Sequence, residues 1–392
     1  MKKKILVLTD TMPWGHRSIA KAIYGYLKEK EKEMKWEVQY AEIKAETGVG
    51  NDFYQLYYRF SPKVGKIAPI IARSKMAGEI FNRLAELNLK NLKWRISRMK
   101  PDLIISCYLF HSRSLALMKK RGKQNFKLWT IVADPWTSTV ASFIKGADLH
   151  LVYDEVEEEA AIEAGIEKEK VLKTGWWVRP QMYRKCDREM ARKKLGFTDD
   201  RPVVFVGGGS LGTNSLTRIL PVLMILRKKV GFIFNTGTDR LAYNMVEEYK
   251  RIFGLINNRG LVQIKNLGWI DNMAEVLSAC DVVFGKAGPN FLFDVVAVGK
   301  PFVAITHIGG QEDGNIELIK EKRLGWVKEK PGEAASFLIN YLKNPKKYNE
   351  IFDDDIRKEA KNNRGSLERI VERIKKDEMG KMIQETRNMI HE

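Results

Sequence analysis

The densest group of side chains that could bind a ligand lies between Asp281 and Asn315. This stretch has the pattern of a buried strand, a Gly-Pro turn, an apolar helix, a second strand and a polar loop with glycines. Parallel α/β sheets bind ligands beyond the carboxyl ends of their strands, where such loops meet the N-termini of helices. The pattern therefore predicts a ligand site. Its predicted residues are Lys286, Gly288, Asp294, Gln311 and Glu312.

A second candidate is a run of glycines between a predicted strand and a predicted helix. The backbone N–H groups of Gly207, Gly208 and Gly209, with the hydroxyl of Ser210, could bind a diphosphate there. The same run satisfies the G-x-G-x-x-G pattern of dinucleotide-binding folds, which is a weak signal on its own. Such a fold would have an acidic residue at the end of the next strand, where this chain has Asn235. A dinucleotide-dependent oxidoreductase is therefore kept only as an alternative.

Near the N-terminus, Gly15 and His16 begin a predicted helix. Apolar side chains follow at helical spacing, at Ile19, Ala22 and Ile23. A helix N-terminus disfavours a protonated imidazole, so His16 is expected to be neutral and able to accept a proton. The alternative interpretation is a histidine that only caps the helix or packs.

The composition predicts a soluble chain with more than one domain. Its 392 residues exceed what one hydrophobic core usually supports, and 44% hydrophobic with 30% charged residues is an ordinary balance. No run of about 18 uncharged apolar residues occurs, and Asp10 comes too early for a signal peptide. The three cysteines, Cys107, Cys186 and Cys280, are too few and too scattered for a disulfide framework or a zinc site. We therefore expect a cytoplasmic protein without a spanning helix.

The formal net charge of +19 indicates an anionic partner or a general enrichment in charged residues. The three explanations are nucleic acid, an anionic lipid surface, and the Lys and Glu enrichment of heat-adapted proteins. No nucleic-acid motif is visible in the sequence. The expected partner is therefore an anionic membrane surface, and no nucleic acid is expected.

Residues 51–75 mix aromatic and basic side chains, which is the composition of segments that lie at a membrane interface. The predicted membrane contacts are Tyr57, Tyr58, Arg59, Phe60, Lys63 and Lys66. Packing of the aromatic residues in a core is the alternative for this segment.

Strand-like segments alternate with longer amphipathic ones along the whole chain, which predicts doubly wound α/β domains with mostly parallel strands. The expected strands are Lys4–Leu8, Glu37–Glu42, Leu103–Ser106, Leu128–Val132, Leu149–Val152, Val171–Thr174, Val203–Val206, Phe232–Asn235, Val262–Lys265, Val282–Phe284 and Phe302–Ile305. We place a linker at residues 179–200, where prolines bracket one short helix. The expected domains are residues 1–178 and 201–352, followed by a charged helical segment at 353–392.

The motifs also resemble a known family. The Lys-Ala-Gly-Pro turn followed by Gly-Gln-Glu-x-Gly-Asn resembles the nucleotide-sugar half of the diacylglycerol glycosyltransferases. That family includes monogalactosyldiacylglycerol synthase and processive diacylglycerol glucosyltransferase, which are relatives of the lipid II N-acetylglucosaminyltransferase. The resemblance implies the GT-B fold, in which two Rossmann-like domains face a cleft and a C-terminal helix crosses back to the first domain.

In the first half, the resemblance assigns catalytic residues. The Gly15–His16 pair matches a glycine-rich acceptor loop whose histidine is proposed to act at the acceptor hydroxyl, although Trp14 stands where the family has glycine. Asp134 matches an aspartate that lines the cleft and could orient or assist the histidine. Its alternative role is that of a turn residue. Trp176 and Trp177 replace an Ile-Pro pair of the family.

In the second half, the resemblance assigns donor-binding residues. Trp269 and Ile270 match a segment whose backbone contacts the base, so they are expected to flank uracil. Asp294 matches a glutamate that binds the ribose hydroxyls, and Phe291 stands where a threonine is usual. The residues that match readers of the sugar hydroxyls are Gln311 and Glu312.

The predicted function is transfer of a sugar from a UDP-sugar to the hydroxyl of a diacylglycerol-like membrane lipid, with inversion at the anomeric carbon. No Asp-x-Asp metal motif is evident among the predicted site residues, so no metal or other cofactor is expected and the UDP-sugar is a substrate. The expected location is the inner face of the cell membrane. Transfer of N-acetylglucosamine to a polyprenyl-linked or soluble acceptor is one alternative, and a membrane-surface binding protein that has lost catalysis is another.

Overall fold

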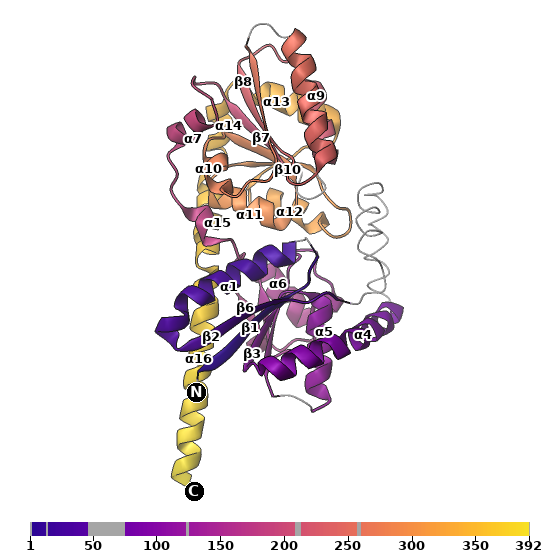
Figure 1. Cartoon of the computed structure of the whole chain (residues 1–392), viewed down its shortest axis with the longest axis vertical. Helices are drawn as coiled ribbons and strands as arrows, with labels where there is room; N and C mark the ends of the chain where they lie inside the picture. Colours follow the sequence, from indigo (N-terminus) through magenta and orange to yellow (C-terminus); the bar gives the residue numbers. More distant parts are fainter. Residues whose placement is uncertain are drawn as a thin grey trace.

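The computed structural model describes residues 2–12, 15–45, 75–122, 125–207, 213–256 and 260–391. Two α/β lobes lie one above the other along the long axis of the molecule, and each is built on a six-stranded sheet (Figure 1). The strand pairs in the described parts of both sheets are parallel. The predicted pair of doubly wound, Rossmann-like units is thus confirmed.

The sheet of the N-terminal lobe has the strand order β2-β1-β3-β4-β5-β6. Its strands are β1 (Lys3–Thr9), β2 (Trp36–Glu42), β3 (Leu103–Ser106), β4 (Lys127–Ile131), β5 (Leu149–Val152) and β6 (Val171–Lys173). Its helices are α1 (Gly15–Met34), α4 (Lys75–Met99), α5 (Leu109–Lys120) and α6 (Glu155–Glu163), with the 3-10 turns η2 (Val140–Ser142) and η3 (Lys168–Lys170). Alternate residues of β1 enter two separate apolar cores, with Ile5 and Val7 on one face and Leu6 and Leu8 on the other.

The sheet of the C-terminal lobe has the strand order β12-β11-β10-β7-β8-β9. Its strands are β7 (Val203–Gly207), β8 (Val230–Asn235), β9 (Val262–Leu267), β10 (Val282–Lys286), β11 (Phe302–Thr306) and β12 (Gly325–Val327). Its helices are α8 (Thr213–Leu223), α9 (Arg240–Ile256), α10 (Met273–Ser278), α11 (Pro289–Ala297), α12 (Asp313–Glu321), α13 (Pro331–Tyr341) and α14 (Pro345–Glu350). The edge strand β12 is absent from the strands expected from the sequence.

One apolar core continues from lobe to lobe. It contains Ile5 and Val7 of β1, Phe205 of β7 and Phe293 of α11. Trp176, which follows β6, joins the two halves of this core and has no exposed surface. Because burial of apolar side chains favours association of the surfaces that carry them, this core holds the lobes together.

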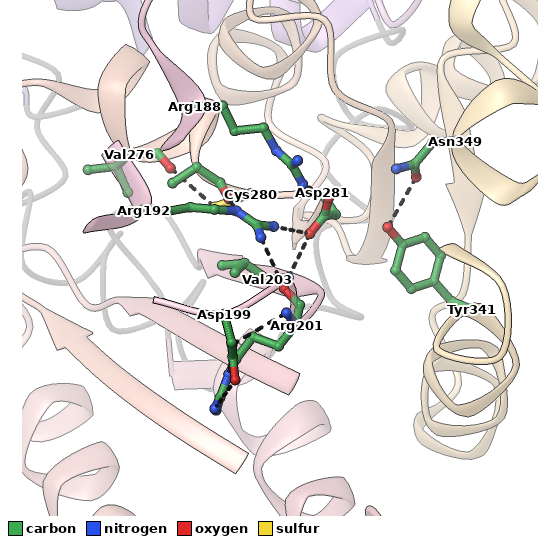
Figure 2. Close-up of polar contacts among 11 residues, drawn as sticks. Arg188, Arg192, Asp199, Arg201, Val203, Val276, Cys280, Asp281, Tyr341 and Asn349 are labelled. Carbon is green, nitrogen blue, oxygen red and sulfur yellow. Dashed lines mark hydrogen bonds and ion pairs between the residues drawn. The ribbon is translucent and has the colours of Figure 1, made fainter. Parts of the chain in front are cut away.

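The connection between the lobes consists of the 3-10 turn η4 (Pro180–Tyr183) and the helix α7 (Arg188–Lys194), and α7 is held to the C-terminal lobe by Asp281 (Figure 2). The Asp281 carboxylate accepts hydrogen bonds from Nη2 of Arg192 and from the backbone N–H of Val203, each at 2.7 Å, and also pairs with Arg188. Nε of Arg192 donates to the carbonyl of Ala279 at 3.0 Å. The carboxylate therefore ties α7 to the start of β7.

The chain returns to the N-terminal lobe through α15 (Asp353–Arg364) and α16 (Ser366–His391). In Figure 1, α16 runs along the N-terminal lobe and extends past it. The Tyr26 hydroxyl donates to Glu368 at 2.5 Å and the Trp36 indole donates to Glu378 at 2.9 Å. The expected crossing of the C-terminal helix is thus confirmed. None of the helices in the described ranges, α16 included, has an apolar stretch long enough to cross a membrane.

Asp281→Ala should lower the free energy of unfolding by about 3–5 kcal/mol, because it leaves the nearly buried guanidinium of Arg192 without its carboxylate. Urea denaturation followed by tryptophan fluorescence would measure the change. Arg188→Ala is the matched control, since the Arg188 side chain is 48% exposed and its loss should cost about 1 kcal/mol or less. Equal losses for the two variants would contradict the role given to Asp281.

Candidate active site

The candidate site lies where the carboxyl ends of the two sheets meet. His16 is the second residue of α1, and Asp134 follows β4, so both belong to the N-terminal lobe. Lys286 ends β10 and Gln311 precedes α12, so both belong to the C-terminal lobe. Nε2 of Gln311 donates to Oδ1 of Asp134 at 3.3 Å and links the two groups directly. The structure therefore brings together residues that are far apart in the sequence.

His16 lies in a largely apolar environment at the start of α1. Its ring packs edge-on against Tyr108, with the ring centroids 5.4 Å apart. Its Nδ1 is buried and has no hydrogen-bond partner among the described residues. Burial lowers the pKa of His16 below its ordinary value, against the opposing effects of the nearby carboxylates of Asp134 and Asp10. The ring is therefore neutral at neutral pH and can accept a proton.

Asp134 lies between the two lobes. Burial raises the pKa of the Asp134 carboxyl, and the Glu312 carboxylate adds to this effect. His16, the Gln311 amide and Lys286 act in the opposite direction. These influences place Asp134 within electrostatic reach of His16 on one side and of Lys286 and Glu312 on the other.

Glu312 is the centre of the polar group that the C-terminal lobe contributes. It is 5% exposed, pairs with Lys286 and accepts a hydrogen bond from the backbone N–H of Ile308 at 2.7 Å. A side chain at Gly288 would place its Cβ 3.0 Å from Nζ of Lys286 and 3.3 Å from Oε1 of Glu312. We call residues 307–312, between β11 and α12, the Gln-Glu loop. Asn315 Nδ2, just beyond this loop, donates to the carbonyl of Ala287 at 2.8 Å, which joins the Lys-Ala-Gly-Pro turn to the loop. The two motifs thus form one polar surface.

His307 is the first residue of the Gln-Glu loop and contacts Asp313, the residue that follows the loop. Its Nδ1 lies 2.6 Å from Glu329 and its Nε2 lies 2.9 Å from Asp313. The Glu329 carboxylate, and then that of Asp313, raise the pKa of His307 above its ordinary value. Both ring nitrogens donate in the protonated form, so His307 holds the two ends of the loop together as an imidazolium.

Asp294 has a partner outside this polar group. Its carboxylate pairs with Arg179 at 2.5 Å, and the residue is 8% exposed. Burial raises the pKa of Asp294, while Arg179 opposes the shift. The expected contact with ribose hydroxyls stays a prediction, and one carboxylate oxygen is already bound to an arginine that the sequence did not indicate.

The other predicted residues have contacts of their own, with residues other than Asp134, Lys286 and Glu312. Trp269 is 72% exposed and its indole donates to Asp271 at 2.8 Å, while Ile270 is partly buried against the core. Gly207 ends β7 beside the ring of Phe291, where an added Cβ would be 3.2 Å from that ring. The residues that lie outside the described ranges are Trp14, Gly208, Gly209, Ser210, Tyr57, Tyr58, Arg59, Phe60, Lys63 and Lys66.

Two residues near the site were not assigned from the sequence. Asn290 is the second residue of α11 and contacts both Trp176 and Gly15 of the other lobe. Tyr108 follows β3 and packs on His16. The position of Asn290 in the Lys-Ala-Gly-Pro-Asn turn could have indicated a cleft residue, whereas no sequence signal marks Tyr108.

Two family models match successive parts of the chain. Residues 16–178 match the family model of monogalactosyldiacylglycerol (MGDG) synthase, and residues 203–345 match that of the glycosyltransferase family 28 C-terminal domain. A probable monogalactosyldiacylglycerol synthase of Nicotiana tabacum is 24% identical over 87% of this chain and 64% of its own length. A processive diacylglycerol beta-glucosyltransferase of Bacillus licheniformis is 21% identical over 89% of each chain. These matches confirm the resemblance to the diacylglycerol glycosyltransferases.

The overlap with the plant proteins is partial. The match to a probable monogalactosyldiacylglycerol synthase of Glycine max is 24% identical over 64% of this chain, and it spans about half of that relative, 48%.

Solved structures with the same fold include MurG of Acinetobacter baumannii, with a TM-score of 0.57 and 15% identity over 95% of this chain and 99% of that one. Anabaena Alr3699/HepE in complex with UDP and glucose has a TM-score of 0.55 and 16% identity over 96% of this chain and 100% of that one. A UDP-GlcNAc 2-epimerase of Neisseria meningitidis has a TM-score of 0.61 and 13% identity over 95% of this chain and 100% of that one. The chain has the GT-B fold, and this fold is shared by proteins that carry out different reactions.

The histidines should differ in charge at about pH 6.5, the ordinary midpoint of the side chain. Burial keeps His16 and His111 neutral, whereas two carboxylates keep His307 protonated. Imidazole nitrogen NMR across about pH 4.5–8.5, two units on either side of that midpoint, would measure the protonation of each ring, with the signals assigned by single His→Gln variants. A His16 midpoint above that of His307 would contradict the electrostatic picture of the site.

Proposed function

We propose that this protein is a glycosyltransferase that moves a sugar from a UDP-sugar to the hydroxyl of a diacylglycerol-like lipid at a membrane surface. The observation that carries the proposal is that two groups of polar side chains, one from each lobe, lie next to each other. His16 and Asp134 come from the N-terminal lobe, and Lys286, Gln311 and Glu312 come from the C-terminal lobe. The two family matches, and the printed activities of the plant and Bacillus relatives, support this donor and this acceptor.

In the proposed reaction, His16 removes the proton from the acceptor hydroxyl as its oxygen attacks the anomeric carbon. A neutral imidazole can accept this proton, and desolvation of the ring favours that neutral form. Asp134 lies within electrostatic reach of the ring and stabilises the imidazolium that forms. Attack from the face opposite to the diphosphate inverts the anomeric centre.

On the donor side, the leaving diphosphate gains charge as the glycosidic bond breaks. We assign its stabilisation to the Lys286 ammonium and to the N-terminal amides of α11, which begins directly after the Lys-Ala-Gly-Pro turn. Gln311 and Glu312 bind hydroxyls of the sugar, since an amide and a carboxylate supply both donors and acceptors. With these groups, the proposed reaction needs no cofactor, and the UDP-sugar is a substrate.

One face of α4 supplies a contact for the membrane surface. Its exposed residues include two large apolar side chains, Leu87 at 53% and Trp94 at 62% exposed. Arg83, Lys90 and Arg98 share this face at helical spacing, and the Arg98 guanidinium lies 5.4 Å from the centre of the Trp94 ring. An apolar pair within a cationic face is suited to the interface of an anionic bilayer. We propose that the protein works there, on the inner face of the cell membrane.

The proposed reaction predicts that the protein forms a glycolipid from a UDP-hexose and a diacylglycerol in mixed micelles, which mass spectrometry of the product would identify. His16→Gln should lower kcat by about 10²–10⁴ and leave UDP affinity unchanged, because the base does not contact the donor. In the wild type, the rate should fall as the pH drops through the lowered pKa of His16, since the protonated ring accepts no proton. This acid limb should be absent from the residual activity of His16→Gln.

Glu312→Gln is the matched donor-side variant. It should weaken binding of the UDP-sugar more than binding of UDP, as measured by calorimetry. Lack of UDP binding by the wild type would refute the donor assignment. A product that carries N-acetylglucosamine on a polyprenyl-linked or soluble acceptor would redirect the function to that alternative. UDP and liposome binding without turnover would support a surface-binding protein that has lost catalysis.

The α4 face predicts that Trp94→Ser reduces sedimentation with anionic liposomes. The indole contributes apolar contact with the bilayer. Each basic residue contributes about 1 kcal/mol to the free energy of membrane binding, and this electrostatic part weakens as salt shortens the Debye length. Binding should therefore be strong at low salt and partly lost at high salt. Trp269→Ser, which removes another exposed tryptophan from the C-terminal lobe, is the control and should bind as the wild type does. Equal effects of the two changes would exclude α4 as the contact.

A further inference from the structure

Asn290 lies at a contact between the two lobes. It is the second residue of α11 and follows the Lys-Ala-Gly-Pro turn. Nε1 of Trp176, from the N-terminal lobe, donates to Oδ1 of Asn290 at 3.2 Å. Nδ2 of Asn290 lies 2.2 Å from the position that a Cβ on Gly15 would occupy. The amide therefore fills the space between an indole and the first residue of α1.

The orientation of this amide is determined by Trp176. An indole N–H only donates, so the oxygen of Asn290 must face Trp176 and its nitrogen must face Gly15. The indole itself is rigidly held, because it has no exposed surface and stacks on Phe293 with the ring centroids 5.2 Å apart. A fixed chain of contacts thus runs from Trp176 through Asn290 to Gly15.

This chain of contacts ends beside the proposed base. Gly15 directly precedes His16, and Asn290 belongs to α11, whose N-terminal amides are assigned above to the diphosphate. We propose that Asn290 is a positioning residue that sets the distance between His16 and the donor-side turn, and that Gly15 is required because a side chain there would displace the Asn290 amide from its hydrogen bond with Trp176. The proposal rests on the function proposed above for His16.

A double-mutant cycle tests the proposal. Gly15→Ala adds a methyl group onto the Asn290 amide, so the amide must leave the Trp176 indole or α1 and α11 must move apart, and kcat should fall by about 10- to 100-fold with UDP affinity unchanged. Asn290→Ala in the same protein removes the amide and should restore kcat to within about threefold of the Asn290→Ala single variant. Gly25→Ala is the matched control, because this glycine also lies in α1 but has nothing within 4 Å of an added Cβ.

A second measurement does not depend on turnover. The imidazole NMR signals of His16 should move in Gly15→Ala and return in the double variant, while thermal unfolding shows all the variants folded. Signals and kcat in Gly15→Ala that match the wild type would overturn the proposal, as would a double variant no better than Gly15→Ala. If His16→Gln keeps full turnover while the His16 signals follow the cycle, the assignment of the base fails and the positioning contact stands.

Discussion

Trp176 packs its fully buried indole between Tyr153 of the N-terminal lobe and Phe293 of α11, with ring centroids 6.1 and 5.2 Å away. Its backbone N–H donates to the Asn363 side chain of α15 at 2.8 Å. One residue therefore contacts both lobes and the returning C-terminal segment. Since buried aromatic rings supply large contact areas, the relative placement of the two sheets depends on this packing.

The polar contacts between the lobes follow from that placement. Lys322 of the C-terminal lobe reaches Asp154 of the N-terminal lobe at 2.9 Å, and the Asp154 carboxylate also accepts from the Trp136 indole. The backbone N–H of Gly314 donates to Thr137 at 3.1 Å, and a Cβ at Gly314 would lie 2.4 Å from the Trp136 backbone. These contacts are close because the apolar core holds the lobes together, and they then keep the Gln-Glu loop beside Asp134.

The pKa values of two histidines shift in opposite directions because the surroundings of the two rings differ. His16 is partly buried and its Nδ1 has no hydrogen-bond partner among the described residues, so desolvation favours the neutral form and the pKa falls. His307 is flanked by Glu329 and Asp313, so the charged form is favoured and the pKa rises. The first ring is suited to accept a proton, whereas the second is suited to hold a loop. The same side chain has two roles because desolvation dominates at one position and carboxylates dominate at the other.

Local patterns in the sequence determined the strands, the alternation of strand and helix, and the motifs at the strand ends, because hydrophobic periodicity and glycine turns act over a few residues. β6 is equally short and was expected, whereas β12 was missed because it starts at Gly325 and glycine is disfavoured in strands. Only the tertiary structure decided which polar groups meet. Asp294 pairs with Arg179, and Asn290 meets Gly15, across separations that no sequence pattern spans. Those contacts depend on how the buried faces of the two lobes pack, and packing is a property of the whole fold rather than of any segment.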